Sequence, residues 1–275
     1  CYWGNLEMPE TSLLSTVQYI NSLIEVAEAK GVYLEIGTDF TTFRKTIMKE
    51  GIRTTVAPVF DPDLSDVSPA NAFWIIGVND RGDVVHTQAA RMIDLSGVTL
   101  SDHLAQYLRE YWFDRDRVDM AQSRVCLSPT TSQMTGKLCY HGELWLKAGR
   151  NNLGGSLTAA LMRLLPAMGS LLWSPDYFLA FVTAYGASKG LMARGGYTHL
   201  EQGSIFWHLK GDNGLTEDWL SWMDQQDLEH MMKIPPEHFD TWYRGGAEDV
   251  LDAANHNFQV PPPTRGKRAF RRSIN

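Results

Sequence analysis

The feature that most constrains the fold of this chain is a glycine-rich loop between an apolar strand and an amphipathic helix. Glu143–Lys147 is short and apolar enough for a strand, and the loop Gly149–Ser156 follows it. A helix N-terminus has unpaired N–H groups and a partial positive charge, and glycines let a backbone approach phosphate oxygens closely. The unit therefore indicates a phosphate site, with an ordinary strand-to-helix turn as the alternative. The helix is indicated by leucines that share one side: Leu157, Leu161, Leu164 and Leu165. Pro166 is expected to disturb its end.

Helices and strands alternate along the rest of the chain. The apolar spacing predicts helices over residues 13–27, 41–49, 101–111, 188–194 and 217–256. It predicts strands over residues 32–36, 72–78, 84–93, 177–183 and 199–209, and an extended segment over residues 52–60. The turn cluster at residues 79–83 joins two of these strands into a β-hairpin. Such an order is typical of an α/β protein.

The loop and its surroundings resemble the central motif of the GNAT acyltransferase superfamily, in which an apolar strand runs into a Gln/Arg-x-x-Gly-x-Gly/Ala loop that opens a helix. Here Asn151 falls at the Gln/Arg position, Gly154 at the first glycine and Ser156 at the Gly/Ala position. Downstream, Gly196-Tyr197 resembles the family's Gly-Phe or Gly-Tyr pair, and residues 73–93 resemble its hairpin. The resemblance spans residues 52 to 210.

The resemblance implies a mixed α/β fold with a mostly antiparallel central sheet flanked by helices, and extra helical segments at both ends. It also implies a co-substrate, which is acetyl-CoA or another acyl-CoA. The pyrophosphate of this co-substrate would lie at the loop, and its thioester would lie between the strands at 143–147 and 177–183. An amine then attacks the thioester directly in a ternary complex. The residues it assigns to the cofactor are Leu144, Trp145, Leu146, Arg150, Asn151, Asn152, Gly154, Gly155 and Ser156.

Catalytic acid and base residues are harder to place. Many members of the family carry a tyrosine four residues before the Gly-Phe pair as the proton donor to the thiol, but Met192 stands there. Tyr185 and Tyr197 are the nearest substitutes, with a packing role as the alternative. Glu143 and His141 flank the strand, where a base or a base–water relay fits, with an exposed strand-end position as the alternative.

Composition and charge argue against several classes of protein. The 275-residue chain has a net charge of −7, which argues against a nucleic-acid surface and suits a cationic amine acceptor, either a small molecule or a peptide. We see no membrane span and no signal peptide. Three cysteines without paired spacing and eight histidines without ligand spacing predict neither a disulfide framework nor a metal site. We therefore expect a cytoplasmic protein; a homodimer is left open.

The chain is expected to divide into four parts. These are a helical N-terminal extension (1–51), a GNAT-like core (52–210), a C-terminal helical extension (211–260) and a basic, flexible tail (261–275). Aromatic residues in the third part would pack a helix pair, line an acceptor pocket or contact a second copy: Trp219, Trp222, Trp242 and Tyr243.

The predicted function is transfer of an acyl group from acyl-CoA to an amine, and we expect this group to be acetyl. A GNAT-fold module that binds CoA or another ligand without catalysis is the first alternative. The second is an amidohydrolase in which Cys1 serves as an N-terminal nucleophile.

Overall fold

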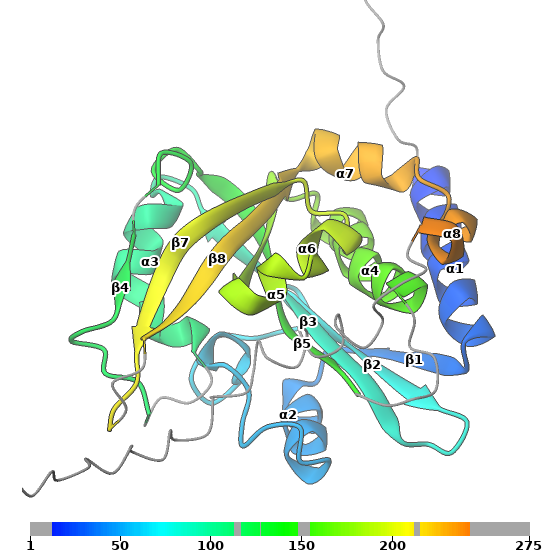
Figure 1. The fold of residues 1–275 in the computed structure, drawn as a ribbon, viewed down its shortest axis with the longest axis horizontal. Helices are drawn as coiled ribbons and strands as arrows, with labels where there is room; N and C mark the ends of the chain where they lie inside the picture. Colours follow the sequence, from blue (N-terminus) through cyan, green and yellow to red (C-terminus); the bar gives the residue numbers. More distant parts are fainter. Residues whose placement is uncertain (1–12, 113–116, 127, 148–154, 212–214, 243–275) are drawn as a thin grey trace, which may run out of the picture.

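The protein is built on one eight-stranded sheet (Figure 1). The computed structural model describes residues 13–112, 117–126, 128–147, 155–211 and 215–242. Across the sheet the strands are β1 (Val32–Gly37), β2 (Ala72–Asn79), β3 (Val84–Leu95), β5 (Gly136–Leu146), β6 (Tyr177–Thr183), β8 (Leu215–Asp224), β7 (His199–His208) and β4 (Arg124–Val125). Among these described strands, only β5 and β6 pair in parallel; all other neighbours are antiparallel. The predicted mixed, mostly antiparallel sheet flanked by helices is confirmed.

Helices cover both faces of this sheet and create two hydrophobic cores. One face packs against α1 (Leu13–Ala29), α4 (Gly155–Trp173), α7 (Gln225–Met232) and α8 (Phe239–Trp242). The other packs against α2 (Phe40–Lys49) and α3 (Leu100–Tyr107). Strand side chains alternate between the two, so that in β2 Phe73 and Ile75 enter the α4-side core while Trp74 and Ile76 enter the α2-side core. The short helices α5 (Ala184–Ser188) and α6 (Leu191–Arg194) follow β6.

A β-bulge interrupts β5 at Glu143. Thr87 of β3 pairs with Trp145, but Ala89 pairs with Gly142, so two β5 residues oppose one residue of β3. Glu143 has a φ of 55°, a left-handed conformation that costs a residue with a side chain about 1–3 kcal/mol. The extra residue resets the alternation, and both Cys139 before it and Leu144 after it reach the α4-side core.

Helix α4 is the central helix of that core. By length and composition it could cross a membrane, with a mean hydropathy of 1.3, but 78% of that window is buried inside the protein. Its apolar surface is therefore accounted for by packing against the sheet and α1. The helix also continues through Pro166 to Trp173, so the expectation that this proline would disturb its end is wrong. Burial on nearly every side offsets the one hydrogen bond that a proline lacks.

Two other local predictions are wrong. Residues 215–224 form β8 and not the start of a C-terminal helix, which begins only at Gln225. The segment 52–60, predicted as extended throughout, is a loop that ends in the 3₁₀ turn Pro58–Phe60. The division of the chain at 51/52 and at 210/211 stays a prediction, while the sheet runs across both boundaries through β1 and β8.

Candidate active site

The central strands β5 and β6 separate soon after they meet. Their parallel pairing joins Leu138 with Tyr177, Cys139 with Phe178, and Tyr140 with Leu179, and it ends there. Past Tyr140, β5 continues along β3, whereas β6 continues along β8. The bulge at Glu143 bends β5 at this point, because an extra residue on one strand kinks it.

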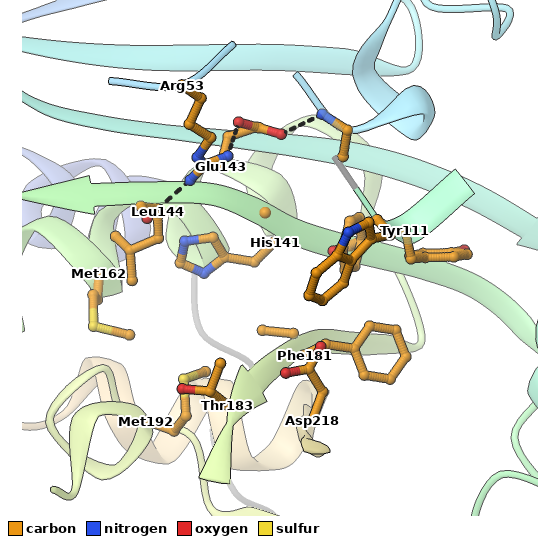
Figure 2. Close-up of a pocket in the computed structure, with 15 residues that line it drawn as sticks. Arg53, Tyr111, His141, Glu143, Leu144, Met162, Phe181, Thr183, Met192 and Asp218 are labelled. Atoms are coloured by element: carbon orange, nitrogen blue, oxygen red, sulfur yellow. Dashed lines mark hydrogen bonds and ion pairs between the residues drawn. The ribbon is translucent and has the colours of Figure 1, made fainter. Parts of the chain in front are cut away.

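A cavity of about 50 Å³ occupies this opening (Figure 2). One part of its lining belongs to the α4-side core and includes Leu144, Met162, Ala180 and Met192. The other part belongs to the α2-side core and is aromatic, with these members: Tyr111, Trp112, Tyr140 and Phe181. Residues of both cores therefore line the cavity, which lies where the two strands diverge.

Glu143 lies in this cavity wall but is held in a buried ion pair. Its carboxylate pairs with the Arg53 guanidinium, and its Oε1 accepts a hydrogen bond of 2.8 Å from the Ala57 backbone N–H. Arg53 also donates to the Leu144 carbonyl oxygen at 3.3 Å. Burial lowers the pKa of the Arg53 guanidinium, and the Glu143 carboxylate opposes that effect. Glu143 is therefore buried and not an exposed strand-end residue, and its charge is neutralised inside the protein.

Asp218 of β8 is a carboxylate of a different kind. It pairs with Thr183 across β6 and β8, and its Oδ2 accepts a hydrogen bond of 2.8 Å from Trp207 Nε1. Burial raises the pKa of Asp218 to about 6; the Trp207 hydrogen bond lowers it, and neighbouring Glu217 raises it further. A carboxylate with such a pKa can accept a proton near neutral pH.

His141 and Tyr197 form a buried pair on the α4 side. His141 is the first β5 residue past the parallel pairing with β6, and its Nδ1 lies 3.1 Å from the Tyr197 hydroxyl. Only 4% of His141 and 6% of Tyr197 is exposed. Burial lowers the pKa of His141 to about 3, with a smaller effect from His86, and burial raises the pKa of Tyr197 well above its usual range. Both side chains are therefore neutral at physiological pH.

The residues that the family resemblance assigns to the cofactor lie in three places. Leu144 lines the cavity, Leu146 is fully buried, and the carbonyl oxygen of Trp145 lies 3.1 Å from His86 Nδ1. Gly155 and Ser156 form the buried first turn of α4. The remaining residues lie outside the described part of the chain: Arg150, Asn151, Asn152 and Gly154.

The predicted tyrosines do not converge on the opening. Tyr185 of α5 is 37% exposed, lies under the Lys189 ammonium and does not line the cavity. Tyr197 is buried with its hydroxyl directed to His141. Met192, at the family's tyrosine position, does line the cavity. Within the described ranges, no group of three or more His, Cys, Asp or Glu side chains could hold a metal ion.

Sequence reasoning missed Asp218 and the aromatic wall. Asp218 falls in a segment whose composition predicts a helix, where a carboxylate looks like an ordinary solvated residue. A signal was present, since side chains in Leu215–Asp224 alternate between the two cores: Leu220 enters the α2-side core and Met223 the α4-side core. Tyr111 and Trp112 had no signal of their own, because only the tertiary fold brings them to β6.

The sheet has the strand arrangement that the resemblance implied. It contains the parallel β5–β6 pair, linked through residues 148–154 and α4, and the two strands splay past Tyr140. The fold has the GNAT-like plan that residues 143–157 and 196–197 led us to expect, and the predicted fold class is confirmed. Membership of the acyltransferase superfamily stays a prediction.

Comparisons with known proteins give only distant structural likenesses. No family model and no curated sequence matches the chain. Similar solved structures include a protein assigned as a phosphinothricin N-acetyltransferase, with 11% identity and a TM-score of 0.35, covering 70% of this chain and 98% of that one. Aminoglycoside acetyltransferase AAC(6')-Ib in complex with coenzyme A and kanamycin has 12% identity and a TM-score of 0.36, covering 72% of this chain and 98% of that one. The same enzyme in complex with paromomycin and acetyl-CoA has 13% identity and a TM-score of 0.36, covering 72% of this chain and 96% of that one.

Proposed function

We propose that this chain is an acyl-CoA-dependent N-acyltransferase that moves an acetyl group to an amine. The observation that supports it most is the cavity at the β5–β6 opening, which is lined by residues from both faces of the sheet. A direct transfer needs such an opening, because the amine must reach the carbonyl carbon of the thioester while the CoA arm is bound.

The cofactor side of the proposal rests on α4. Its N-terminus follows the glycine-rich loop, and unpaired N–H groups at that end favour the pyrophosphate of CoA. Past Tyr140, β5 no longer pairs with β6, so the pantetheine arm can pair with those backbone groups of β5 that lack another partner; the Leu144 carbonyl oxygen already accepts from Arg53. The cavity of about 50 Å³ compares with roughly 10–15 Å³ for one water on the same measure, which favours acetyl over a long acyl chain.

The acceptor side rests on Asp218 and the aromatic wall. Arg53 and Glu143 neutralise each other, so Asp218 supplies the net charge of the described lining. One carboxylate beside aromatic rings favours a cationic amine, which could be a small molecule or an amine-bearing peptide. Asp218 then takes one proton from the ammonium, and the free amine attacks the thioester carbonyl. As the carbon–sulfur bond breaks, the nitrogen loses its second proton to solvent, and the thiolate takes its proton from solvent.

Glu143 and Arg53 have a positioning role in this proposal. Their ion pair, together with the Ala57 N–H, holds the bulge that turns β5 away from β6. A cytoplasmic location also belongs to the proposal. Cys126 and Cys139 are unpaired thiols, which suits a reducing compartment where acyl-CoA is available.

A thiol-release assay with acetyl-CoA and a panel of alkylamines tests the proposal, alongside calorimetry with acetyl-CoA and free CoA. We expect micromolar binding and amine-dependent thiol release. Absence of binding by either compound would remove the donor assignment. Gly154→Val should weaken CoA binding at least tenfold without loss of the folded state, because a branched side chain in the loop would block the pyrophosphate.

A CoA-binding module without catalysis is the second candidate. Met192 favours it, because a thioether in place of the family's tyrosine cannot donate a proton to the leaving thiol. Tight CoA binding without thiol release from any amine would decide for this candidate.

A further inference from the structure

His141 has one ring nitrogen without a partner. Its Nδ1 is bonded to the Tyr197 hydroxyl, whereas no described residue forms a hydrogen bond with its buried Nε2. A buried polar atom left unpaired has lost its hydration without a replacement, which destabilises the folded state. His141 also lines the cavity at the point where β5 and β6 part. A ligand in that opening is therefore the natural partner for Nε2.

The bond to Tyr197 decides which nitrogen carries the proton. If the Tyr197 hydroxyl donates to Nδ1, the pair leaves only the Nε2–H donor unmatched. If Nδ1–H donates to the hydroxyl instead, both the phenol proton and the Nε2 lone pair are unmatched. Each unmatched buried group adds a desolvation cost, so the first arrangement is the more stable one. Tyr197 thus fixes His141 as an Nε2–H donor.

We propose that His141 Nε2–H donates a hydrogen bond to the thioester carbonyl oxygen of the bound acyl-CoA. This inference rests on the proposed acyl transfer. When the amine nitrogen bonds to the carbonyl carbon, the π electrons move onto that oxygen, and the hydrogen bond to His141 strengthens. Collapse of the intermediate re-forms the carbonyl and breaks the carbon–sulfur bond. Asp218 has already taken one proton from the ammonium before attack, the nitrogen loses its second proton to solvent as the amide forms, and no proton leaves His141.

Charge and acidity suit this donor role better than proton transfer. Burial keeps the pKa of His141 at about 3, so the ring is neutral and adds no cation next to an incoming ammonium. A neutral imidazole is a far weaker acid than a thiol of pKa about 8.5, so it does not protonate the thiolate. It can still polarise a carbonyl, because its N–H is rigidly held in a site of low dielectric.

The Tyr197 side chain is a positioning residue in this scheme. It lies on the same face of the sheet as Met162 and Met192, and its hydroxyl is buried against His141. Removal of that hydroxyl would let the proton move to either ring nitrogen. Tyr197 therefore supports catalysis by keeping the proton on His141 Nε2, and it does not contact the substrate itself.

Kinetics of matched variants test the inference. His141→Phe keeps a ring but loses the donor, and it should lower kcat by about 10²–10³-fold. The Kd of free CoA, which has no thioester, should stay within threefold. His141→Gln retains an N–H donor, and its kcat should be at least tenfold higher than that of His141→Phe. The kcat of Tyr197→Phe should lie between those of the wild type and His141→Phe. A kcat for His141→Phe within threefold of the wild type would overturn the inference.

A spectroscopic measurement separates this role from a structural one. The carbonyl stretch of bound ¹³C-labelled acetyl-CoA should lie at lower frequency in the wild type than in solution, and the difference should be lost in His141→Phe. An identical frequency in both proteins would refute the hydrogen bond. If acetyl-CoA binds and turns over while the frequency is unchanged, only the His141 inference falls; if the wild type binds no acetyl-CoA, the acyltransferase proposal falls with it.

Discussion

Replacing Asp218 by Asn should stabilise the protein while it slows the reaction. Burial raises the pKa of Asp218 from 3.8 to about 6. At about 1.36 kcal/mol per pKa unit, ionisation of this carboxyl at pH 7 costs the folded state about 3 kcal/mol. Screening by solvent at a partly exposed side chain reduces the value to about 2 kcal/mol. An asparagine oxygen can still accept the hydrogen bond from Trp207 Nε1, so the neutral residue removes the cost and keeps the contact.

The pH dependence has a definite sign. The folded-state pKa of Asp218 lies above the unfolded value, so the folded protein binds more protons between about pH 4 and 6. Stability of the wild type from this group therefore decreases as pH rises through that window. The advantage of Asp218→Asn should be complete above about pH 7 and should vanish near pH 4.

Urea unfolding and thermal melts at several pH values measure the stability effect, which corresponds to a Tm higher by roughly 4–8 °C at pH 7. The same variant should lose about 10²–10⁴-fold in kcat/KM, the usual contribution of a general base. Wild-type kcat/KM should fall on the acid side with an apparent pKa near 6.

Glu217→Gln is the matched control. It removes a carboxylate from the neighbouring position on β8, and with it one cause of the raised pKa of Asp218. Activity should persist, and the acid limb of its pH profile should move to lower pH. An Asp218→Asn protein with kcat/KM within threefold of the wild type, or with a lower Tm at pH 7, would refute the reasoning.

Three further predictions follow from the fold. Glu143→Gln should lower the free energy of unfolding by about 3–5 kcal/mol in urea, because it leaves the buried Arg53 charge uncompensated, whereas the double variant Arg53→Met/Glu143→Leu should recover most of that loss. Gly196→Ala should lower the Tm measurably, since Gly196 has a φ of 85° and an added Cβ would lie 2.4 Å from Met231 Sδ; a Tm unchanged within 1 °C would contradict this close approach. Tyr185→Phe should keep kcat/KM within twofold, because Tyr185 does not line the cavity, and a larger loss would make it a candidate proton donor again.

Local sequence patterns predicted the fold best where one face of an element is apolar. The spacing in α1, the β2–β3 hairpin and β6 specifies each element. In α1 it missed the buried side, because Leu13 and Val17 are exposed whereas Tyr19 and Leu23 are buried. Residues 215–224 were misassigned because tryptophans and charged residues fit a helix as readily as a strand. Pairing with β6 on one edge and with β7 on the other makes this segment a strand. Tertiary pairing thus overrode the local pattern.

Site residues were predictable only where a motif carries them. The resemblance located the opening between β5 and β6, since it follows from the strand–loop–helix–strand order. The partner of Glu143 was not visible, because Arg53 lies 90 residues away along the chain and is brought near by the loop that precedes η1 (Pro58–Phe60). The pairing of His141 with Tyr197 was equally hidden, being a contact across 56 residues.

The insertion of β8 between β6 and β7 has a consequence for biosynthesis. β6 is complete at residue 183, yet the strand that covers its second edge ends only at residue 224. A nascent chain emerging from the ribosome therefore presents an open β edge, the kind that invites pairing with other chains, until the β7–β8 hairpin docks. The strand that closes this edge is also the one that carries Asp218. Protection from misassembly and acquisition of the carboxylate thus occur in a single late step, so a chain that stops short of β8 should be both aggregation-prone and inactive.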